Sequence, residues 1–361
     1  MRCLFDIGHP AEVHYFKHVI RNLERSGHGV LVTARDKDVT LELLDKYGIE
    51  HICTGRNIPS RLGKVFSLFR NDWRIFRAVK KFKPDLIVNF FSPFAAQAGW
   101  LAGVPVLGFH DTEIAGISIR LAIPFTDCVV VPECYTRTLP RTKTICFKGY
   151  FELCHLHPRY FSAAPSIRGE LGLKKEKYVL MRFVSHKAVH DTGISGMSLE
   201  MKRDAVKCFS QNARVLISSE EPLPADLEPY RLNVPVDRIH DAMQNAALCF
   251  GESATMAAES AVLGVPAVFV DQLGRGYTED IETRYGLITR FRPNHLGLQQ
   301  AIEKGMEILA HDQSDVWAQK RERLLHDHID VTAFMTWLIE NYPESVHMMR
   351  EDPEYLGYEK A

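Results

Sequence analysis

The sequence predicts an α/β protein with two doubly wound parallel sheets that face each other across a cleft. Its 361 residues exceed the length that one hydrophobic core usually organises. Short apolar runs alternate with helical stretches in the first half, and this alternation restarts in the second half. We therefore expect two Rossmann-like domains, 1–160 and 161–325, followed by a helical tail, 326–361.

The composition is that of an ordinary water-soluble protein with sizeable cores. Hydrophobic residues make up 46% of the chain and charged residues 25%. The chain has 44 Lys and Arg residues against 45 Asp and Glu, which gives a net charge of -1. This balance excludes a globally basic nucleic-acid binder, so we expect no nucleic-acid partner.

Cysteine usage and the first residues favour a cytoplasmic protein. None of the eight cysteines forms a C-x-x-C pair, and several lie in apolar runs, as reduced, buried thiols do. The opening MRCLFDIGHP is typical of a strand and a turn, and it lacks the apolar centre of a signal peptide.

The first half supplies five expected strands and two clear helices. The helices are 12–25 and 39–47, and the strands are 3–7, 29–34, 85–90, 105–109 and 128–132. The uncharged stretch 86–109 is long enough to span a bilayer. Its Pro and Gly residues break it into strand, loop, helix and strand, so we favour a buried α/β segment.

The second half repeats the rhythm after an aperiodic stretch, 149–165, which we interpret as the linker. Its expected strands are 178–183, 214–218, 247–250 and 267–270. Residues 316–342 are expected to form the helical tail.

One motif is informative about binding: GESATMAAESAVLGVPAVFV, residues 251–270. It predicts the end of a strand, a tight turn, a close-packed helix that ends at Gly264, and a buried strand after Pro266. In an open parallel sheet such a turn lies at the carboxyl edge, where helix N–H groups face a ligand. Residues 103–105, Gly-Val-Pro, repeat this plan in the first half.

This motif and the order of elements resemble the carboxy-terminal domain of GT-B proteins, the fold of nucleotide-sugar glycosyltransferases and of UDP-N-acetylglucosamine 2-epimerase. The stretches DIGHPAEVHYFKHV, RFVSHKAVHD, ISSEEPLP and IETRYGL resemble an uncharacterised GT-B-like family known only as a domain of unknown function. That second resemblance spans nearly the whole chain. It implies a GT-B fold and a nucleotide-diphosphate sugar as ligand, with UDP as the expected nucleotide.

The resemblance assigns the ribose and pyrophosphate contacts to this motif. Glu259 stands five residues before Gly264, where GT-B relatives place a glutamate that binds the ribose hydroxyls. A helix glutamate that bonds locally is the alternative. Ser253 and Thr255 match the pyrophosphate turn, while Glu252 departs from the Ser or Gly that relatives often carry.

Further contacts to the nucleotide sugar are expected in loops of the second domain. The resemblance places a second phosphate contact after the strand 178–183 and a base contact just before residue 240. A charged loop after the strand 267–270 could close on the sugar or diphosphate. A solvated basic loop or a plain turn is the alternative for these residues, which are Arg182, Ser185, His186, Lys187, Arg238 and Arg275.

Four residues of the first domain are candidate catalytic groups. His9 and His14 follow the first strand, and either imidazole could act as general base on an acceptor hydroxyl. Capping or packing histidines are the alternative. Asp111 and Glu113 follow the strand 105–109 in FHDTEIAG, which loosely resembles a Glu-Ala-Gly loop of the epimerase.

A metal hydrolase is a weaker alternative. His14 and His18, and likewise His186 and His190, have the i, i+4 spacing of metal ligands. Neither pair carries the glutamate of a zincin motif, so we expect neither a metal nor a cofactor.

Residues 56–83 contain nine Lys and Arg residues and one acid, interleaved with Phe66, Phe69, Trp73 and Phe76. A basic helix with an aromatic face suits an anionic membrane surface, and a core-facing aromatic stripe with a solvated basic back is the alternative. The sequence thus favours a cytoplasmic glycosyltransferase of glycan or glycolipid biosynthesis, with peripheral membrane contact through 56–83. A UDP-sugar 2-epimerase-like enzyme and a non-catalytic sugar-nucleotide-binding protein remain open.

Overall fold

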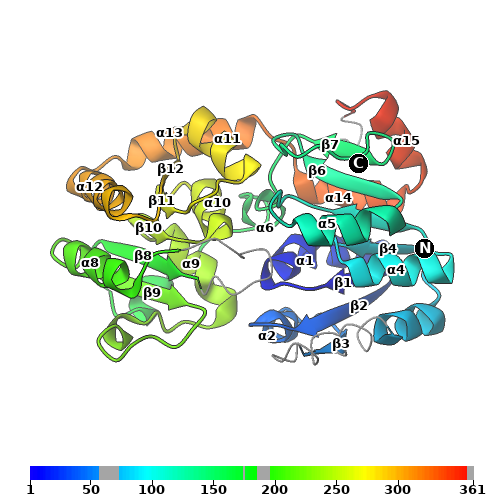
Figure 1. Ribbon diagram of the computed structural model, residues 1–361, viewed down its shortest axis with the longest axis horizontal. Helices are drawn as coiled ribbons and strands as arrows, with labels where there is room; N and C mark the ends of the chain where they lie inside the picture. Colours follow the sequence, from blue (N-terminus) through cyan, green and yellow to red (C-terminus); the bar gives the residue numbers. More distant parts are fainter. Residues whose placement is uncertain (57–72, 174, 185–195, 356–361) are drawn as a thin grey trace. The chain divides into compact units, whose positions relative to one another are not determined.

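The structure is a computed structural model that describes residues 1–56, 73–173, 175–184 and 196–355. The chain forms two compact units (Figure 1). Unit 1 comprises Met1–His155 together with Ile329–Ala361, and unit 2 comprises Leu156–His328. The chain therefore leaves unit 1, builds unit 2 and returns to unit 1.

Unit 1 contains a parallel sheet of seven strands in the order β3-β2-β1-β4-β5-β6-β7. Its strands are β1 (Arg2–Ile7), β2 (Gly29–Asp36), β3 (His51–Arg56), β4 (Leu86–Asn89), β5 (Val106–Phe109), β6 (Cys128–Pro132) and β7 (Thr144–Phe147). The order reverses between β1 and β4, the position where open α/β sheets bind ligands. The sequence pattern missed β3 and β7, because these edge strands mix polar and apolar residues.

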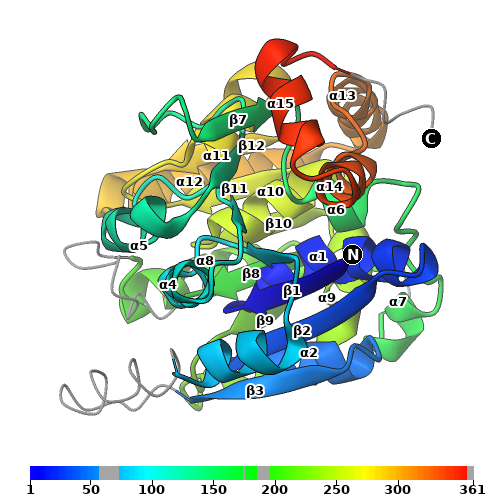
Figure 2. The ribbon, with the colours of Figure 1, turned by 90° about the vertical axis from the view of Figure 1, so that its right-hand side faces the viewer.

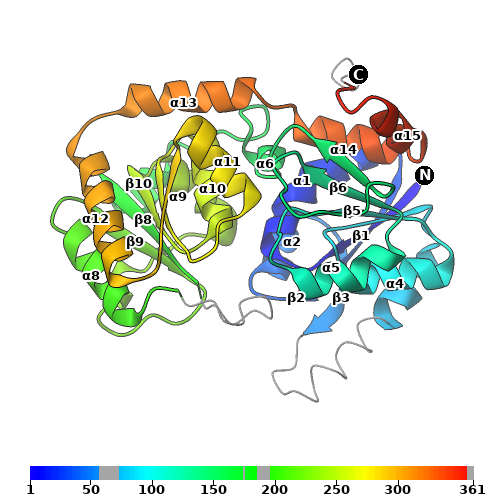
Figure 3. The same cartoon turned by 45° about the horizontal axis from the view of Figure 1, so that its top comes forward.

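The helices of unit 1 cover both faces of this sheet (Figure 3). One face carries α1 and α14: Phe16 of α1 packs on Phe5, and Phe334 of α14 stacks on Phe147. The other face carries helical residues 73–82 together with α4 and α5. The helix bounds are α1 (Pro10–Arg25), α2 (Thr40–Lys46), α4 (Pro93–Ala102), α5 (Gly116–Ala122), α6 (Leu153–Leu156), α14 (Val331–Glu340) and α15 (Glu344–Glu351).

Unit 2 contains a parallel sheet of five strands in the order β12-β11-β10-β8-β9. The strands are β8 (Tyr178–Phe183), β9 (Arg214–Ser219), β10 (Leu248–Gly251), β11 (Ala267–Val270) and β12 (Ile288–Phe291). The helices are α7 (Ile167–Glu170), α8 (Leu199–Phe209), α9 (Ile239–Gln244), α10 (Ala254–Val262), α11 (Gly276–Tyr285), α12 (His295–Ala310) and α13 (Ser314–His326). The packing of α8 and α12 on one sheet face forms the main core of this unit.

The expected linker and tail are more closely packed than their sequences indicate. Residues 149–165 contain α6, and both Tyr150 and Phe151 are 1% exposed. The boundary between the units falls inside this stretch. The tail divides: α13 belongs to unit 2, whereas α14 and α15 return to unit 1.

The uncharged stretch 86–109 forms β4, α4 and β5 of unit 1. Gly103 ends α4 in the left-handed conformation, with a φ of 71°. Among the residues that the structure describes, no helix has both the length and the apolar composition that crossing a membrane requires.

Candidate functional site

The phosphate turn predicted from the motif lies at the carboxyl edge of the unit 2 sheet, after β10. Gly251 ends the strand with a φ of 155°, and a Cβ there would collide with the carbonyl oxygen of Arg182 on the neighbouring β8. Only glycine fits this close approach of two strand ends. The chain then turns through Glu252 and enters α10.

Ser253 is the N-cap of α10, and its Oγ accepts a hydrogen bond from the N–H of Met256 at 3.2 Å. Thr255 lies in the first turn, and both side chains are half-buried. The first N–H groups of this helix therefore face the carboxyl edge of the sheet, where the helix dipole favours an anion.

Glu259 points from α10 toward α9 rather than into solvent. It is 5% exposed, and its Oε1 lies 3.0 Å from Nε2 of His240, which is itself 3% exposed. Because an ionised carboxylate only accepts hydrogen bonds, Nε2 is the protonated nitrogen of this imidazole. His240 thus supplies a protein donor to one oxygen of this carboxylate.

His240 is a candidate site residue that sequence reasoning missed, because it contacts Glu259. It lies in the first turn of α9, and the ring of Phe161 meets it edge-on with centroids 6.1 Å apart. Nothing in the local pattern links residue 240 to residue 259, since the pair forms only when α9 packs beside α10. A histidine in an apolar helix turn beside the expected base loop was the available signal.

Arg238, the expected base-loop residue, is held by two carboxylates of unit 2. Its Nε donates to Asp241 at 2.7 Å, and its Nη2 donates to Glu170 of α7 at 3.2 Å. Its guanidinium therefore links α9 to α7. A contact with a nucleotide base would fall to the backbone of Arg238.

Arg182 lies at the end of β8, as expected for a phosphate contact. Its guanidinium donates to Ser218 Oγ and to Glu220 Oε1, both at 2.9 Å. Nε of Arg182 has no protein partner among the described residues. The other residues predicted in this loop, Ser185, His186 and Lys187, lie outside the described residues.

Glu252, the departure from the relatives' pattern, fastens the two ends of that loop. Its carboxylate accepts the N–H of Val184 at 3.2 Å and the N–H of Met197 at 2.6 Å. Lys202 Nζ lies 2.9 Å from Oε2 and compensates the buried charge. The loop that carries the predicted phosphate ligands therefore starts and ends beside the phosphate turn.

Arg275 is the N-cap residue of α11 and is already engaged within its own loop. Its Nη1 lies 3.0 Å from Asp271 Oδ2 and also donates to the carbonyl oxygen of Leu273. Contact with a sugar or diphosphate would require Arg275 to leave or share Asp271.

The first turn of α1, just after β1 in unit 1, contains a carboxyl group that sequence reasoning passed over. His9 is exposed and caps α1, with Nδ1 accepting the N–H of Ala11 at 3.2 Å. Glu12 accepts the N–H of Gly8 at 2.6 Å, and burial raises the pKa of Glu12 to about 8 although this hydrogen bond opposes the shift. Such a carboxyl group is suited to proton transfer near neutral pH.

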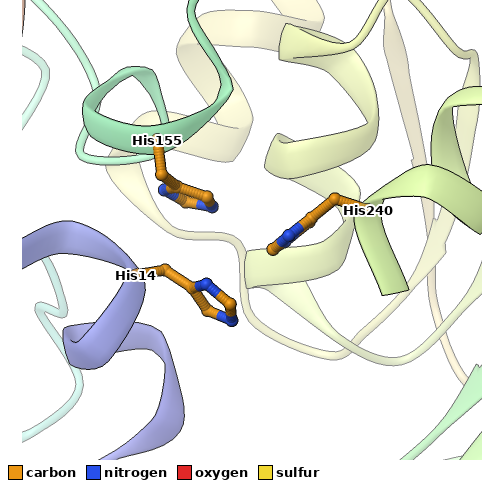
Figure 4. Close-up of side chains that lie close together, drawn as sticks. All are labelled: His14, His155 and His240. Carbon is orange, nitrogen blue, oxygen red and sulfur yellow. The ribbon is translucent and has the colours of Figure 1, made fainter. Parts of the chain in front are cut away.

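His14 is a buried, packed residue of α1. Its Nδ1 lies 3.3 Å from the hydroxyl oxygen of Tyr47, and its ring stacks on His155 with centroids 5.1 Å apart (Figure 4). The third histidine labelled in Figure 4, His240, belongs to unit 2. Burial lowers the pKa of His18, one helical turn beyond His14, to about 4.

Asp111 and Glu113 follow β5 and bond to different threonines. Asp111 is 6% exposed and accepts from Thr112 Oγ1 at 2.7 Å. Glu113 accepts the backbone N–H of Thr136 at 3.2 Å. The preceding His110 is buried, which lowers its pKa to about 3, so this imidazole is neutral under physiological conditions.

Two Rossmann-like units, each built on a parallel sheet, define the class of the protein: it has the GT-B fold. Within that class the chain belongs to the family described as "Protein of unknown function (DUF354)", which matches residues 1–273. The uncharacterized protein MJ0665 of Methanocaldococcus jannaschii is 22% identical over 273 residues, covering 73% of this chain and 80% of that protein.

Solved structures with the same fold include an epimerase and a transferase. The UDP-GlcNAc 2-epimerase from Neisseria meningitidis bound to UDP-GlcNAc has a TM-score of 0.60 and 13% identity, covering 96% of this chain and 100% of that one. The spinosyn rhamnosyltransferase SpnG, complexed with spinosyn aglycone, has a TM-score of 0.61 and 13% identity, covering 94% and 100%. These similarities confirm the fold expected from the sequence.

Proposed function

We propose that the protein is a glycosyltransferase that moves a sugar from a nucleotide-diphosphate sugar, with UDP as the nucleotide, to an acceptor in glycan or glycolipid biosynthesis. The observation that carries the proposal is Glu259, a buried carboxylate on α10, the helix that follows the phosphate turn. Its Oε1 lies 3.0 Å from Nε2 of His240 on α9. A buried carboxylate at this place can accept hydrogen bonds from two neighbouring ribose hydroxyls.

The remaining roles follow from the same edge of unit 2. In this proposal the N-terminus of α10 with Ser253 and Thr255 receives the diphosphate. Lys187, which the sequence assigns as a phosphate ligand, neutralises the leaving group. Arg182 contributes if its Nε turns toward the phosphate. A nucleotide-sugar ligand is supported by two solved structures of the same fold. One is an epimerase with UDP-GlcNAc bound, and the other is a rhamnosyltransferase.

The acceptor base is proposed to come from unit 1. His9, His14, Asp111 and Glu113 are the groups expected from the sequence, and Glu12 joins them because its raised pKa suits the task. We place the reaction in the cytoplasm, beside a membrane that the basic segment 56–83 contacts.

The test is nucleotide binding by Glu259→Ala. Titration calorimetry with UDP should show affinity reduced by about 2 kcal/mol or more, roughly thirtyfold, because a charged acceptor is lost from a desolvated site. Glu303→Ala, which removes an exposed carboxylate of α12, is the matched control and should bind like the unchanged protein. Unchanged affinity of folded Glu259→Ala protein would remove Glu259 from the site.

A 2-epimerase-like reaction is the second candidate, favoured by the Neisseria meningitidis neighbour and by the Glu113-Ile-Ala-Gly sequence after β5. The two reactions differ in their products. Incubation with UDP-GlcNAc and no acceptor should leave the sugar unchanged for a transferase. An altered sugar, analysed together with any free UDP, would favour the epimerase, and binding without any turnover would indicate a non-catalytic binding protein.

A further inference from the structure

The two faces of the unit 1 sheet carry helices of opposite character. The face covered by helical residues 73–82, α4 and α5 is named here the cationic face. These helices pack on the sheet through small and apolar residues such as Ala78, Ala95, Ala98 and Ile119. They lie side by side along the sheet, with Trp100 of α4 meeting Phe125, just after α5, at a centroid distance of 5.4 Å (Figure 2).

Large apolar side chains of the cationic face point away from the core. Trp100 and Leu101 of α4 are 63% and 62% exposed, and Ile117 and Leu121 of α5 are 62% and 50% exposed. Trp73, in the neighbouring helix, is 56% exposed. Adjacent helices that expose several such residues mark a contact surface rather than scattered surface residues.

The charges on this face all have one sign. The residues 73–82, 93–102 and 116–125 include no Asp or Glu, whereas they include Arg74, Arg77, Lys80, Lys81 and Arg120. On the opposite face, α1 and α2 carry acids and bases together, among them Glu24 and Asp45. The protein as a whole has a net charge of only -1, so the cationic face is a local concentration of positive charge.

Two carboxylates, Asp85 and Asp127, lie at the starts of β4 and β6 rather than on these helices. Asp85 accepts the N–H of Arg2 at 2.7 Å, and Asp127 accepts the N–H of Val106 at 2.8 Å. Both are therefore engaged with the backbone at the amino edge of the sheet. Lys81 and Arg120, on helices that flank α4, are exposed to solvent.

We propose that the cationic face docks on an anionic lipid bilayer. Trp100, Leu101, Ile117 and Leu121 would enter the headgroup and acyl boundary, while Lys81 and Arg120 on either side would meet lipid phosphates. Tryptophan favours this interfacial depth because its ring is apolar and its N–H is polar. The proposal does not depend on nucleotide binding by unit 2.

The same features disfavour two other occupants. A second copy docked face to face would bring like charges together, which opposes association. A nucleic acid would use the cations but would leave Leu101, Ile117 and Leu121 without an apolar partner. A bilayer with an anionic surface and an apolar interior matches both the charged and the apolar residues of this face.

The experiment is sedimentation of the full chain with vesicles, without nucleotide. At low salt the protein should pellet with vesicles that contain phosphatidylglycerol and stay in solution with pure phosphatidylcholine, and added salt should release it. Lys81→Glu with Arg120→Glu should lower the partition coefficient about tenfold or more. Arg25→Glu with Lys46→Glu is the matched control, since it makes the same charge change at exposed sites of α1 and α2 and should pellet like the unchanged protein.

The apolar half of the surface is tested separately by Leu101→Ser with Ile117→Ser, which should also reduce pelleting although no charge changes. Equal loss in the Arg25 and Lys46 control would show general electrostatic attraction and overturn the docking face. The docking face would also be overturned if the unchanged protein does not pellet with anionic vesicles at low salt. If light scattering shows that the unchanged protein is a dimer and that only the Leu101 and Ile117 variant is a monomer, this face would instead be assigned to contact with a second copy.

Discussion

Two strand-helix-strand segments of the molecule share the same backbone structure but differ in the surfaces that their side chains form. The first repeat is β4-α4-β5 in unit 1, and the second repeat is β10-α10-β11 in unit 2. Ser92 and Ser253 cap their helices by accepting an N–H group at 3.4 and 3.2 Å. Gly103 and Gly264 end them in the left-handed conformation, with φ values of 71° and 81°.

Even the hydrogen bonds that close the two helices agree. The N–H of Val104 donates to the carbonyl oxygen of Gly99, and the N–H of Val265 donates to the carbonyl oxygen of Ser260, both at 2.9 Å. A proline follows each valine and prevents the helix from continuing. The backbone plan is thus the same in both units.

The side chains make the difference. Five residues before the glycine, the second repeat carries Glu259 and the first carries Ala98. The last turn of α4 exposes Trp100 and Leu101, whereas the corresponding turn of α10 is covered by α13, whose Arg321 donates to the carbonyl oxygen of Val262 at 2.9 Å. One backbone unit therefore supports a buried polar site in one place and an exposed apolar surface in the other.

The largest effect is expected from moving the carboxylate into the first repeat. Ala98→Glu should destabilise unit 1 by about 3 kcal/mol or more, because Ala98 is 2% exposed in an apolar cluster and would bury an unpaired charge. Chemical denaturation gives the free energy of unfolding. A loss below about 1 kcal/mol would mean that the cluster offers a polar partner comparable to His240.

The glycines that end the helices should respond unequally. Gly264→Ala is expected to cost about 2 kcal/mol, because its Cβ would combine left-handed strain with a contact of 2.7 Å to Arg321 Cδ. Gly103→Ala has the strain alone, with no atom within 4 Å of its Cβ, and should cost about 1 kcal/mol. Equal losses in thermal unfolding would show that Arg321 moves aside freely.

The capping serines should give equal stability effects and unequal binding effects. Ser92→Ala and Ser253→Ala each remove one N-cap hydrogen bond and should each cost about 1 kcal/mol. Only Ser253→Ala should weaken UDP binding in calorimetry, since its hydroxyl lies at the proposed diphosphate site. Weaker UDP binding in both variants would show that the loss does not come from a contact at the phosphate turn.

The smallest effect is expected at the exposed end of α4. Leu101→Ser should change the free energy of unfolding by less than about 0.5 kcal/mol, because the side chain is 62% exposed and leaves no cavity. Denaturation of this variant also serves as the folding control for the vesicle experiment. A larger loss would mean that Leu101 contributes to the fold, which would weaken its assignment to a contact surface.

The repeats also show which features a sequence can predict. Strand runs, Ser caps and Gly-Val-Pro endings are local, so the sequence located β4, α4 and β5 as well as β10, α10 and β11. The position of Glu259 follows from its distance to Gly264 along the chain. Its partner His240, the grip of Glu252 on Val184 and the raised pKa of Glu12 arise from packing between segments distant in sequence, which no local pattern encodes.

The return of α14 to unit 1 has a consequence for biosynthesis. Phe334, Met335, Leu338 and Ile339 of α14 are 0% exposed, so the face of the sheet they cover stays open until α14 has left the ribosome. Unit 2, by contrast, is contiguous and can fold as soon as His328 has emerged. The domain whose synthesis begins first is therefore completed last, and a nascent chain stalled before Val331 would present an uncovered apolar face to chaperones.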